Sequence, residues 1–145
     1  MTEVAFHFGA PDRLAYTCRL LRKATATGAR LLVRAPADAL AALDLALWSV
    51  GAGDFVTHCD AAAADAMRSR SSVLLLDEHA ELQPEFPILV NLAKDVPPGF
   101  EQFARVIEIV SMDEQDRNLA RLRWKHYTGR GYSITRHDLK SRAVD

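Results

Sequence analysis

Short apolar runs alternate with segments of helical periodicity along most of the chain, and this alternation limits the fold more than any other feature. The runs are rich in Leu, Val and Ile, and they are bounded by Pro, Gly or charged residues. Such runs are typical of buried strands, whereas the segments between them repeat apolar residues at the spacing of one helical face. This order of strands and helices predicts an α/β layer fold with a mostly parallel sheet.

Five segments are predicted to form strands, together with one shorter extended segment. The strands lie at residues 3–8, 29–35, 73–77, 87–93 and 105–110, and the extended segment lies at residues 54–59. Prolines on both sides of the fourth strand isolate it as a short element. The chain shows neither an internal repeat nor a linker-like segment, so residues 1–145 are expected to form a single domain.

Three segments are predicted to form long helices, residues 99–104 a short helical turn, and residues 61–72 either a loop or a short helix. The first covers residues 11–28, where Pro and Asp open the helix and Gly ends it. The second covers residues 36–51, again from a Pro to a Gly. Its apolar stripe consists of Leu40, Leu43 and Leu47. The third begins at a capping box of Ser111 and Glu114 and runs to about Thr128.

Composition and charge exclude several classes of protein. Apolar residues make up 49% of the 145 residues and charged residues 26%, which is ordinary for a globular domain. The formal net charge of −1 gives no overall basic field that would attract nucleic acid. Cys18 and Cys59 lack the spacing of metal ligands and are expected to be buried in a reducing compartment. No signal peptide or membrane-spanning run is evident, which favours the cytoplasm and no membrane partner.

One strand ends in acidic residues, as the Mg²⁺-binding strand of a helicase-like ATPase does. The segment SVLLLDEHAEL places Asp77, Glu78 and His79 directly after its apolar run. A nucleotide site also needs a phosphate loop of the form G-x-x-x-x-G-K-[ST], and none of the seven glycines lies in one. The three residues are therefore expected to begin a surface loop. A helicase-like, nucleotide-dependent enzyme that uses Asp77 and Glu78 is the alternative hypothesis.

Other catalytic motifs are missing from the sequence. Neither the G-x-S-x-G elbow of serine hydrolases nor the H-E-x-x-H motif of zinc proteases occurs. The five histidines are scattered along the chain and show no ligand-like spacing. The sequence therefore predicts no catalytic activity, no cofactor and no metal site.

The last helix carries the most informative pattern. A helical projection groups Leu119, Leu122 and His126, which are predicted to pack on the sheet. A second face is basic and contains one aromatic residue. It consists of Arg117, Arg121, Trp124 and Lys125. Two interpretations stay open: a solvated charged stripe, or a groove for an anionic peptide or nucleic acid. A compact site for a short acidic peptide fits better than single-stranded DNA, which needs several aromatic platforms.

Three stretches resemble, in the same order, the chi subunit of bacterial DNA polymerase III holoenzyme. They are LDLALWSVGAGDFVTH, PILVNLAKDVPPGFEQFARVIEIV and ARLRWKHYTGRGYSI, and the resemblance extends over nearly the whole chain. It implies a non-catalytic adaptor of the clamp-loader complex in the bacterial cytoplasm. The implied fold is a three-layer, Rossmann-like α/β domain without a nucleotide site, whose mixed sheet has about five strands and helices on both faces.

The resemblance also implies partners and site residues. The adaptor would bind the acidic C-terminal tail of single-stranded DNA-binding protein (SSB), which ends in a Phe with a free carboxylate, and would reach DNA indirectly through SSB. The implied tail site consists of Arg117, Arg121, Trp124, Lys125 and Val110. Arg121 is expected to pair with a carboxylate of the tail, while Val110 and Trp124 receive the Phe ring. Direct binding of single-stranded DNA by the basic helix is a further hypothesis.

A second contact is implied with the psi subunit or another clamp-loader subunit. The resemblance places this contact on Trp48 and Phe55. The physical alternative for Trp48 is a core position, because a Trp at the end of an amphipathic helix is usually buried.

Overall fold

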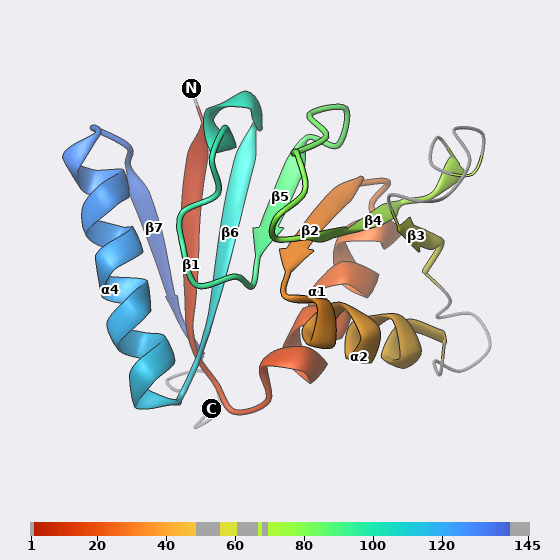
Figure 1. Ribbon diagram of the computed structural model, residues 1–145, viewed down its shortest axis with the longest axis horizontal. Coiled ribbons are helices and arrows are strands. Elements are labelled where there is room, and N and C mark those ends of the chain that lie inside the picture. The colour runs from red at the N-terminus through yellow and green to blue at the C-terminus, as the bar shows by residue number, and fades with distance from the viewer. Residues whose placement is uncertain (1, 49–55, 61–66, 68–69, 140–145) are drawn as a thin grey trace.

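Seven parallel strands form one sheet in the computed structural model, which describes residues 2–48, 56–60, 67 and 70–139 (Figure 1). The strand order is β3-β4-β2-β5-β6-β1-β7, and every neighbouring pair runs parallel. The strands are β1 (Glu3–Ala10), β2 (Leu31–Ala35), β3 (His58–Asp60), β4 (Val73–Asp77), β5 (Ile88–Asn91), β6 (Arg105–Ser111) and β7 (Ile134–Asp138).

Three α-helices and one short 3-10 helix are present in the described residues. They are α1 (Arg13–Ala26), α2 (Ala37–Trp48), η1 (Phe100–Gln102) and α4 (Glu114–Gly129). The Asp12 side chain caps α1 by accepting a hydrogen bond from the Ala15 amide, as the Pro-Asp opening predicts. Gly28 follows the end of α1 with a φ of 87°, a conformation that glycine adopts at low cost. The predicted end of the second helix at Gly51 lies outside the described residues.

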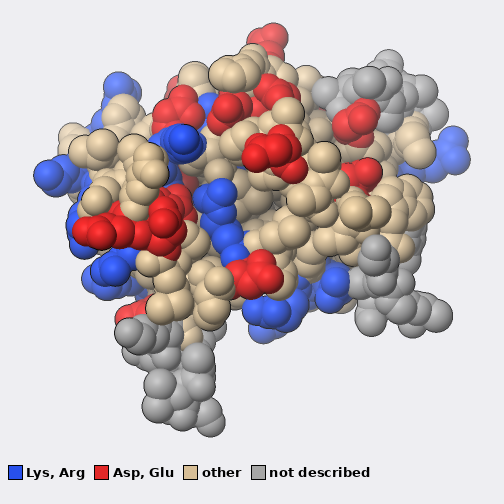
Figure 2. Space-filling model, turned by 60° about the horizontal axis from the view of Figure 1, so that its bottom comes forward, with Lys and Arg blue, Asp and Glu red and all other residues tan. Residues whose placement is uncertain are grey.

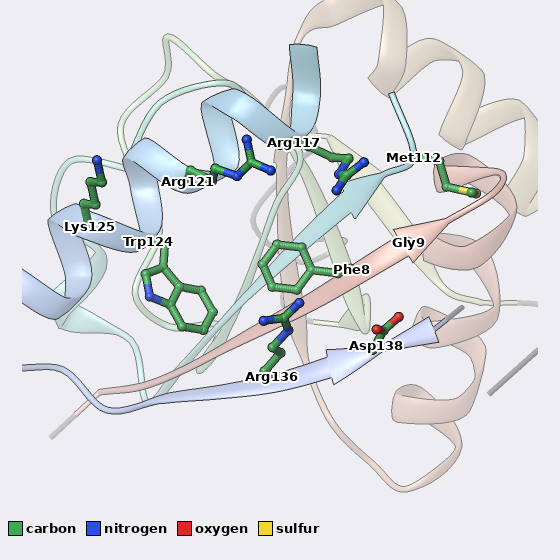
Figure 3. Close-up of a pocket in the computed structure, with 9 residues that line it drawn as sticks. All are labelled: Phe8, Gly9, Met112, Arg117, Arg121, Trp124, Lys125, Arg136 and Asp138. Atoms are coloured by element: carbon green, nitrogen blue, oxygen red, sulfur yellow. The ribbon is translucent and has the colours of Figure 1, made fainter. Parts of the chain in front are cut away.

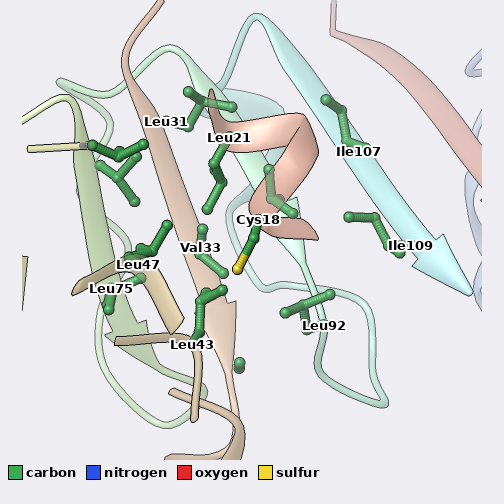
Figure 4. Close-up of a cluster of buried hydrophobic side chains, with 14 of the residues drawn as sticks. Cys18, Leu21, Leu31, Val33, Leu43, Leu47, Leu75, Leu92, Ile107 and Ile109 are labelled. Carbon is green, nitrogen blue, oxygen red and sulfur yellow. The ribbon is translucent and has the colours of Figure 1, made fainter. Parts of the chain in front are cut away.

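The helices cover both faces of the sheet. In Figure 1, α1 and α2 lie on one face and α4 on the other. Each face has its own apolar core, because successive strand residues point to opposite sides. On the α1–α2 side, Leu31, Val33 and Leu75 pack with Cys18 and Leu43 (Figure 4).

The core on the opposite face lies beneath α4. Leu32, Leu74 and Val106 pack there with the α4 residues Ala120 and Tyr127. Both cysteines are free and buried, as predicted, with one in each core.

The predicted α/β fold with helices on both faces is confirmed, and the predicted sheet needs two revisions. It has seven strands instead of about five, because the short segment at β3 and the unpredicted β7 both join it. It is also fully parallel instead of mixed. β7 was missed because this edge strand is largely exposed and has Ile134 as its single apolar residue, so it lacks an apolar run. No described helix has the length and apolar character needed to cross a membrane.

Candidate functional site

A pocket of about 420 Å³ lies between α4 and the sheet, near the carboxyl ends of β1 and β6. These two strands are neighbours, but β1 continues into α1 on one face and β6 into α4 on the other. Connections that leave adjacent parallel strands in opposite directions open a crevice at their carboxyl ends, where α/β proteins bind ligands. The topology therefore favours a binding site at this position.

Residues from four segments line the pocket, as Figure 3 shows. They are Phe8, Gly9, Met112, Arg117, Arg121, Trp124, Lys125, Arg136 and Asp138. The strand pairing of β1 with β6 is irregular between His7 and Ala10, and Gly9 has a φ of 79°. Such a bulge bends the strand end, and the left-handed backbone explains why glycine suits this place.

Four cations surround the pocket. Arg117, Arg121 and Lys125 are exposed on α4, and Arg136 is exposed on β7. Arg121 donates a hydrogen bond of 2.7 Å to the Asn118 side chain. Within the described part of the chain, none of the four forms an ion pair, so their charges are available to an anionic ligand.

Aromatic rings form the apolar part of the pocket. The Trp124 ring lies 5.1 Å from the Phe6 ring and 5.9 Å from the Phe8 ring, between ring centroids. Phe6 is fully buried and anchors the group, whereas Phe8 and Trp124 are half-buried. The pocket therefore offers an apolar floor beside cationic groups, a combination that suits an anionic ligand with an apolar anchor.

The structure brings together four of the five residues predicted for the tail site. Arg117, Arg121, Trp124 and Lys125 share one face of α4 and line the pocket. Val110 does not line it, because this side chain is fully buried in the core beneath α4. The predicted direct contact of Val110 with a ligand ring therefore needs correction: the residue supports the pocket from below.

The sequence prediction missed the sheet side of the pocket. Phe8 and Gly9 belong to β1, Met112 follows β6, and Arg136 and Asp138 belong to β7. β7 has the sequence ITRHD, in which Ile134 is the single apolar residue, so the segment shows no alternation of apolar and polar residues. Polar residues on both faces of such a segment are equally typical of a loop, so the sequence signal for a strand is weak.

The start of α4 differs from the predicted capping box. Asp113 is the N-cap and accepts from the Asp116 amide at 3.1 Å, while Asp116 accepts from the Ser111 amide at 2.8 Å. Glu114 takes no part in these bonds. Acidic side chains gather where α4 begins, at the left of Figure 2, with basic side chains around them. This placement suits the positive end of the helix dipole.

The buried face of α4 also differs from the prediction. Leu122 is 61% exposed, although the projection placed it on the sheet. The side chains that face the sheet are Ala120, Arg123 and Tyr127. The physical reason is Glu108, a buried carboxylate on β6 that needs hydrogen-bond donors.

Glu108 lies at the centre of a buried polar network. Arg123 Nε donates to Oε1 at 3.0 Å, Tyr127 donates to Oε2 at 2.7 Å, and the Asn91 amide donates to both oxygens at 3.0 Å. Burial raises the pKa of the Glu108 carboxyl, while the Arg123 charge opposes the increase. Burial also raises the pKa of the Tyr127 hydroxyl, and the Glu108 charge adds to this increase. The network fixes α4 to β6 and thereby positions the pocket face.

The acidic strand end after β4 shows a structural role. The Asp77 side chain accepts from the His79 amide at 2.9 Å, which stabilises the turn that follows the strand, as expected for a surface loop. Glu78 lies 3.5 Å from the His79 ring nitrogen. Among the described residues, no group of three or more metal-ligating side chains occurs.

Trp48 is exposed at the end of α2. Its side chain is 59% exposed, so the alternative of a core position is wrong. Leu45, one turn earlier, is 69% exposed. The Trp48 ring contacts the His58 ring edge-on, with 5.0 Å between centroids. Phe55, the other residue predicted for this contact, lies outside the described residues.

Comparison with solved structures shows the fold. The chain is similar to the C-terminal domain of a S. cerevisiae Dbp5 variant, in a structure where that domain is bound to a Gle1 variant and IP6. The TM-score is 0.61 and the identity 15%, over 95% of this chain and 90% of that chain. A second structure of the C-terminal domain of the DEAD-box protein Dbp5 gives a TM-score of 0.59 at 16% identity, over 96% and 90% of the two chains. At such identities the likeness concerns the fold alone.

Comparison with families gives a more specific result. No curated protein sequence matches the chain significantly. The family described as DNA polymerase III chi subunit, HolC, matches residues 1–135, which include most of the pocket. Members of this family are accessory subunits of the polymerase III holoenzyme in DNA replication. The chain therefore belongs to the DNA polymerase III chi subunit family.

Proposed function

We propose that this chain is a non-catalytic adaptor that binds the acidic C-terminal tail of SSB in the pocket between α4 and β7. One observation carries the proposal: four cations without ion pairs in the described residues surround an aromatic floor in one pocket. Membership of the chi family supports a role at the replication complex. The adaptor would work in the bacterial cytoplasm and link SSB-coated DNA to the polymerase through psi or another clamp-loader subunit.

The chemistry of the tail matches the two parts of the pocket. Arg121 lies at the middle of the cationic row on α4, so it is placed to bind the terminal carboxylate or a tail acid. The terminal Phe ring would rest on Trp124 and Phe8. Because Val110 is buried in the core beneath α4, Phe8 would make the contact that the resemblance implied for Val110.

Fluorescence anisotropy with a labelled SSB-tail peptide tests the proposal. We expect a dissociation constant in the micromolar range, about 8 kcal/mol of binding free energy, which salt weakens by screening the charge pairs. Removing the terminal Phe from the peptide, or substituting Arg121→Ala, should weaken binding at least about tenfold. Equal affinity in all these combinations would rule out the assigned pocket.

A matched control separates the pocket from general charge. Arg105 is a half-exposed arginine of β6 that does not line the pocket, and Arg105→Ala should leave peptide affinity unchanged. A mobility shift with an oligonucleotide in the absence of SSB tests direct DNA binding. If the wild type shifts the oligonucleotide and Arg121→Ala abolishes the shift, the basic face of α4 binds DNA and the peptide proposal is disfavoured.

A second proposed contact joins α2 to psi or another clamp-loader subunit. The outer face of α2 carries Leu45 and Trp48, which are exposed, whereas Leu43 and Leu47 are buried on its inner face. A helix that is apolar on both faces usually lies between two packed surfaces, so a partner is expected on the outer face.

Co-purification from a bacterial extract tests this contact. Trp48→Ala should remove the clamp-loader partner while SSB-tail binding persists, and Arg121→Ala should do the opposite. If Trp48→Ala retains the partner fully, the contact lies elsewhere on the chain.

A further inference from the structure

β7 gives the proposed peptide pocket a second cationic wall, which the α4 residues alone do not provide. It is an edge strand that runs parallel to β1, with Phe6 paired to Arg136 and Phe8 paired to Asp138. Figure 3 shows Arg136 on the opposite side of Phe8 from Arg121. The pocket is therefore a groove with basic groups on both sides and Phe8 at its base.

We propose that Arg136 is a specificity-determining residue of this groove, which binds a carboxylate of an acidic peptide from the side opposite Arg121. This inference rests on the proposed function, because it concerns the same pocket. It adds a residue that lies one position beyond the stretch matched to the family, residues 1–135.

The environment of Arg136 prepares its guanidinium for such a contact. The guanidinium carbon lies 5.0 Å from the centroid of the Phe8 ring, as in a cation–π contact. Stacking on a ring limits the orientations of the guanidinium and leaves its N–H groups free to bind a carboxylate in a bidentate manner. A lysine offers neither the planar stack nor the two parallel donors.

Asp138 limits where the acids of a peptide can lie. It is the one acid among the lining residues, and Figure 3 shows it towards the end of the groove that Gly9 and Met112 form. At the other end of the groove, near Trp124, all charged lining residues are cationic. Like charges repel, so the carboxylates of the peptide should gather between Arg121 and Arg136, away from Asp138.

Peptide-binding measurements on β7 variants test the inference. Arg136→Gln removes the charge and keeps most of the side-chain volume, and we expect it to weaken the SSB-tail peptide roughly threefold to tenfold. Arg136→Lys should recover part of this loss. The salt dependence of binding should also become weaker in Arg136→Gln, a change that a purely structural defect would not produce.

Two controls isolate the charge of Arg136. Asp138→Asn lies on the same strand and should strengthen binding by about twofold, because it removes a repulsion. A loss of affinity in Asp138→Asn as large as in Arg136→Gln would show that any change in β7 disturbs the pocket, and would overturn the inference. In a peptide whose acids are replaced by amides, Arg136→Gln should have no effect.

The outcomes separate this inference from the proposed function. If the wild type binds, Arg121→Ala abolishes binding and Arg136→Gln leaves it unchanged, then Arg136 has no role and the adaptor function stands. If the wild-type chain does not bind the peptide at all, both proposals are wrong.

Discussion

Arg123 and Glu108 form an ion pair inside the protein, with the Nε donating to Oε1 at 3.0 Å and side chains only 2% and 0% exposed. The pair joins α4 to β6 through the side of α4 that faces the sheet, whereas Arg117, Arg121 and Lys125 line the pocket from another side of the helix. Arg123 also donates to the Lys94 carbonyl at 2.8 Å, whereas its Nη2 has no partner within the described residues. Removing one partner of such a pair destabilises the protein strongly, because the other charge stays buried without a counter-charge. Replacing both partners with apolar residues avoids that cost.

The first prediction follows from this difference. Glu108→Gln should lower the free energy of unfolding by about 3–5 kcal/mol, because it leaves the Arg123 charge buried without its counter-charge. The double variant Glu108→Leu/Arg123→Met should recover only part of that loss, because it removes both buried charges but leaves the Tyr127 hydroxyl without its acceptor. Urea denaturation of the wild type, the single variant and the double variant, each fitted to a two-state model, measures the three free energies of unfolding. A double variant as unstable as the single one would show that the pair contributes net stability.

The second prediction concerns the hydroxyl of Tyr127. Burial raises the pKa of this hydroxyl above its ordinary value of about 10, so the folded protein favours the protonated form. Its contribution to stability is therefore fully present below the unfolded pKa and is lost as the pH rises above it. Tyr127→Phe removes the bond to Glu108 and should cost about 1.5–3 kcal/mol at neutral pH.

Alkaline titration distinguishes the two states of Tyr127. The stability difference between the wild type and Tyr127→Phe should shrink as the pH rises above about 10. Tyrosinate absorbance of the two folded proteins should coincide until the chain unfolds, and the wild type should then gain additional absorbance. An earlier separation of the two curves would mean that Tyr127 titrates in the folded state.

The general fold was predictable because apolar runs and helix boundaries are local signals. The runs at β2 and β4 and the Asp12 cap each carried enough information within a few residues. The short β3 and the edge strand β7 did not, because their place in the sheet depends on neighbours that are distant in the sequence. The pocket residues that β7 contributes, Arg136 and Asp138, were therefore not predictable from the sequence.

The orientation of α4 was predicted incorrectly for a different reason. Hydrophobicity alone selected Leu122 for the sheet, but the sheet presents a row of polar residues at this place. Arg34, Asn91 and Glu108 lie side by side on β2, β5 and β6. Each of these polar residues interrupts an apolar run in the sequence, and together they indicated that a polar partner had to face them.

The third prediction tests this orientation. Leu122→Lys should change the free energy of unfolding by no more than about 0.5 kcal/mol, because the side chain already lies in solvent. Ala120→Lys should destabilise the protein by several kcal/mol, because Ala120 is fully buried in the core beneath α4. Thermal denaturation of both variants measures the difference. Equal destabilisation would place Leu122 against the sheet after all.

The fourth prediction uses the two tryptophans to separate the two proposed interfaces. Trp124 lines the pocket and is half-buried, whereas Trp48 is 59% exposed on α2. Peptide binding should change the environment of Trp124 alone. In Trp48→Phe, the remaining emission should shift to the blue as the SSB-tail peptide saturates the pocket, because the peptide excludes water from the indole.

The complementary variant is the control for this measurement. In Trp124→Phe the aromatic wall is kept, and the emission of Trp48 should stay constant while anisotropy still reports binding of the labelled peptide. A peptide-dependent change in Trp48 emission would mean that the peptide contacts α2, or that the two surfaces are coupled. Addition of the clamp-loader partner should reverse the pattern and change Trp48 alone, because Trp48 and the pocket belong to helices on opposite faces of the sheet.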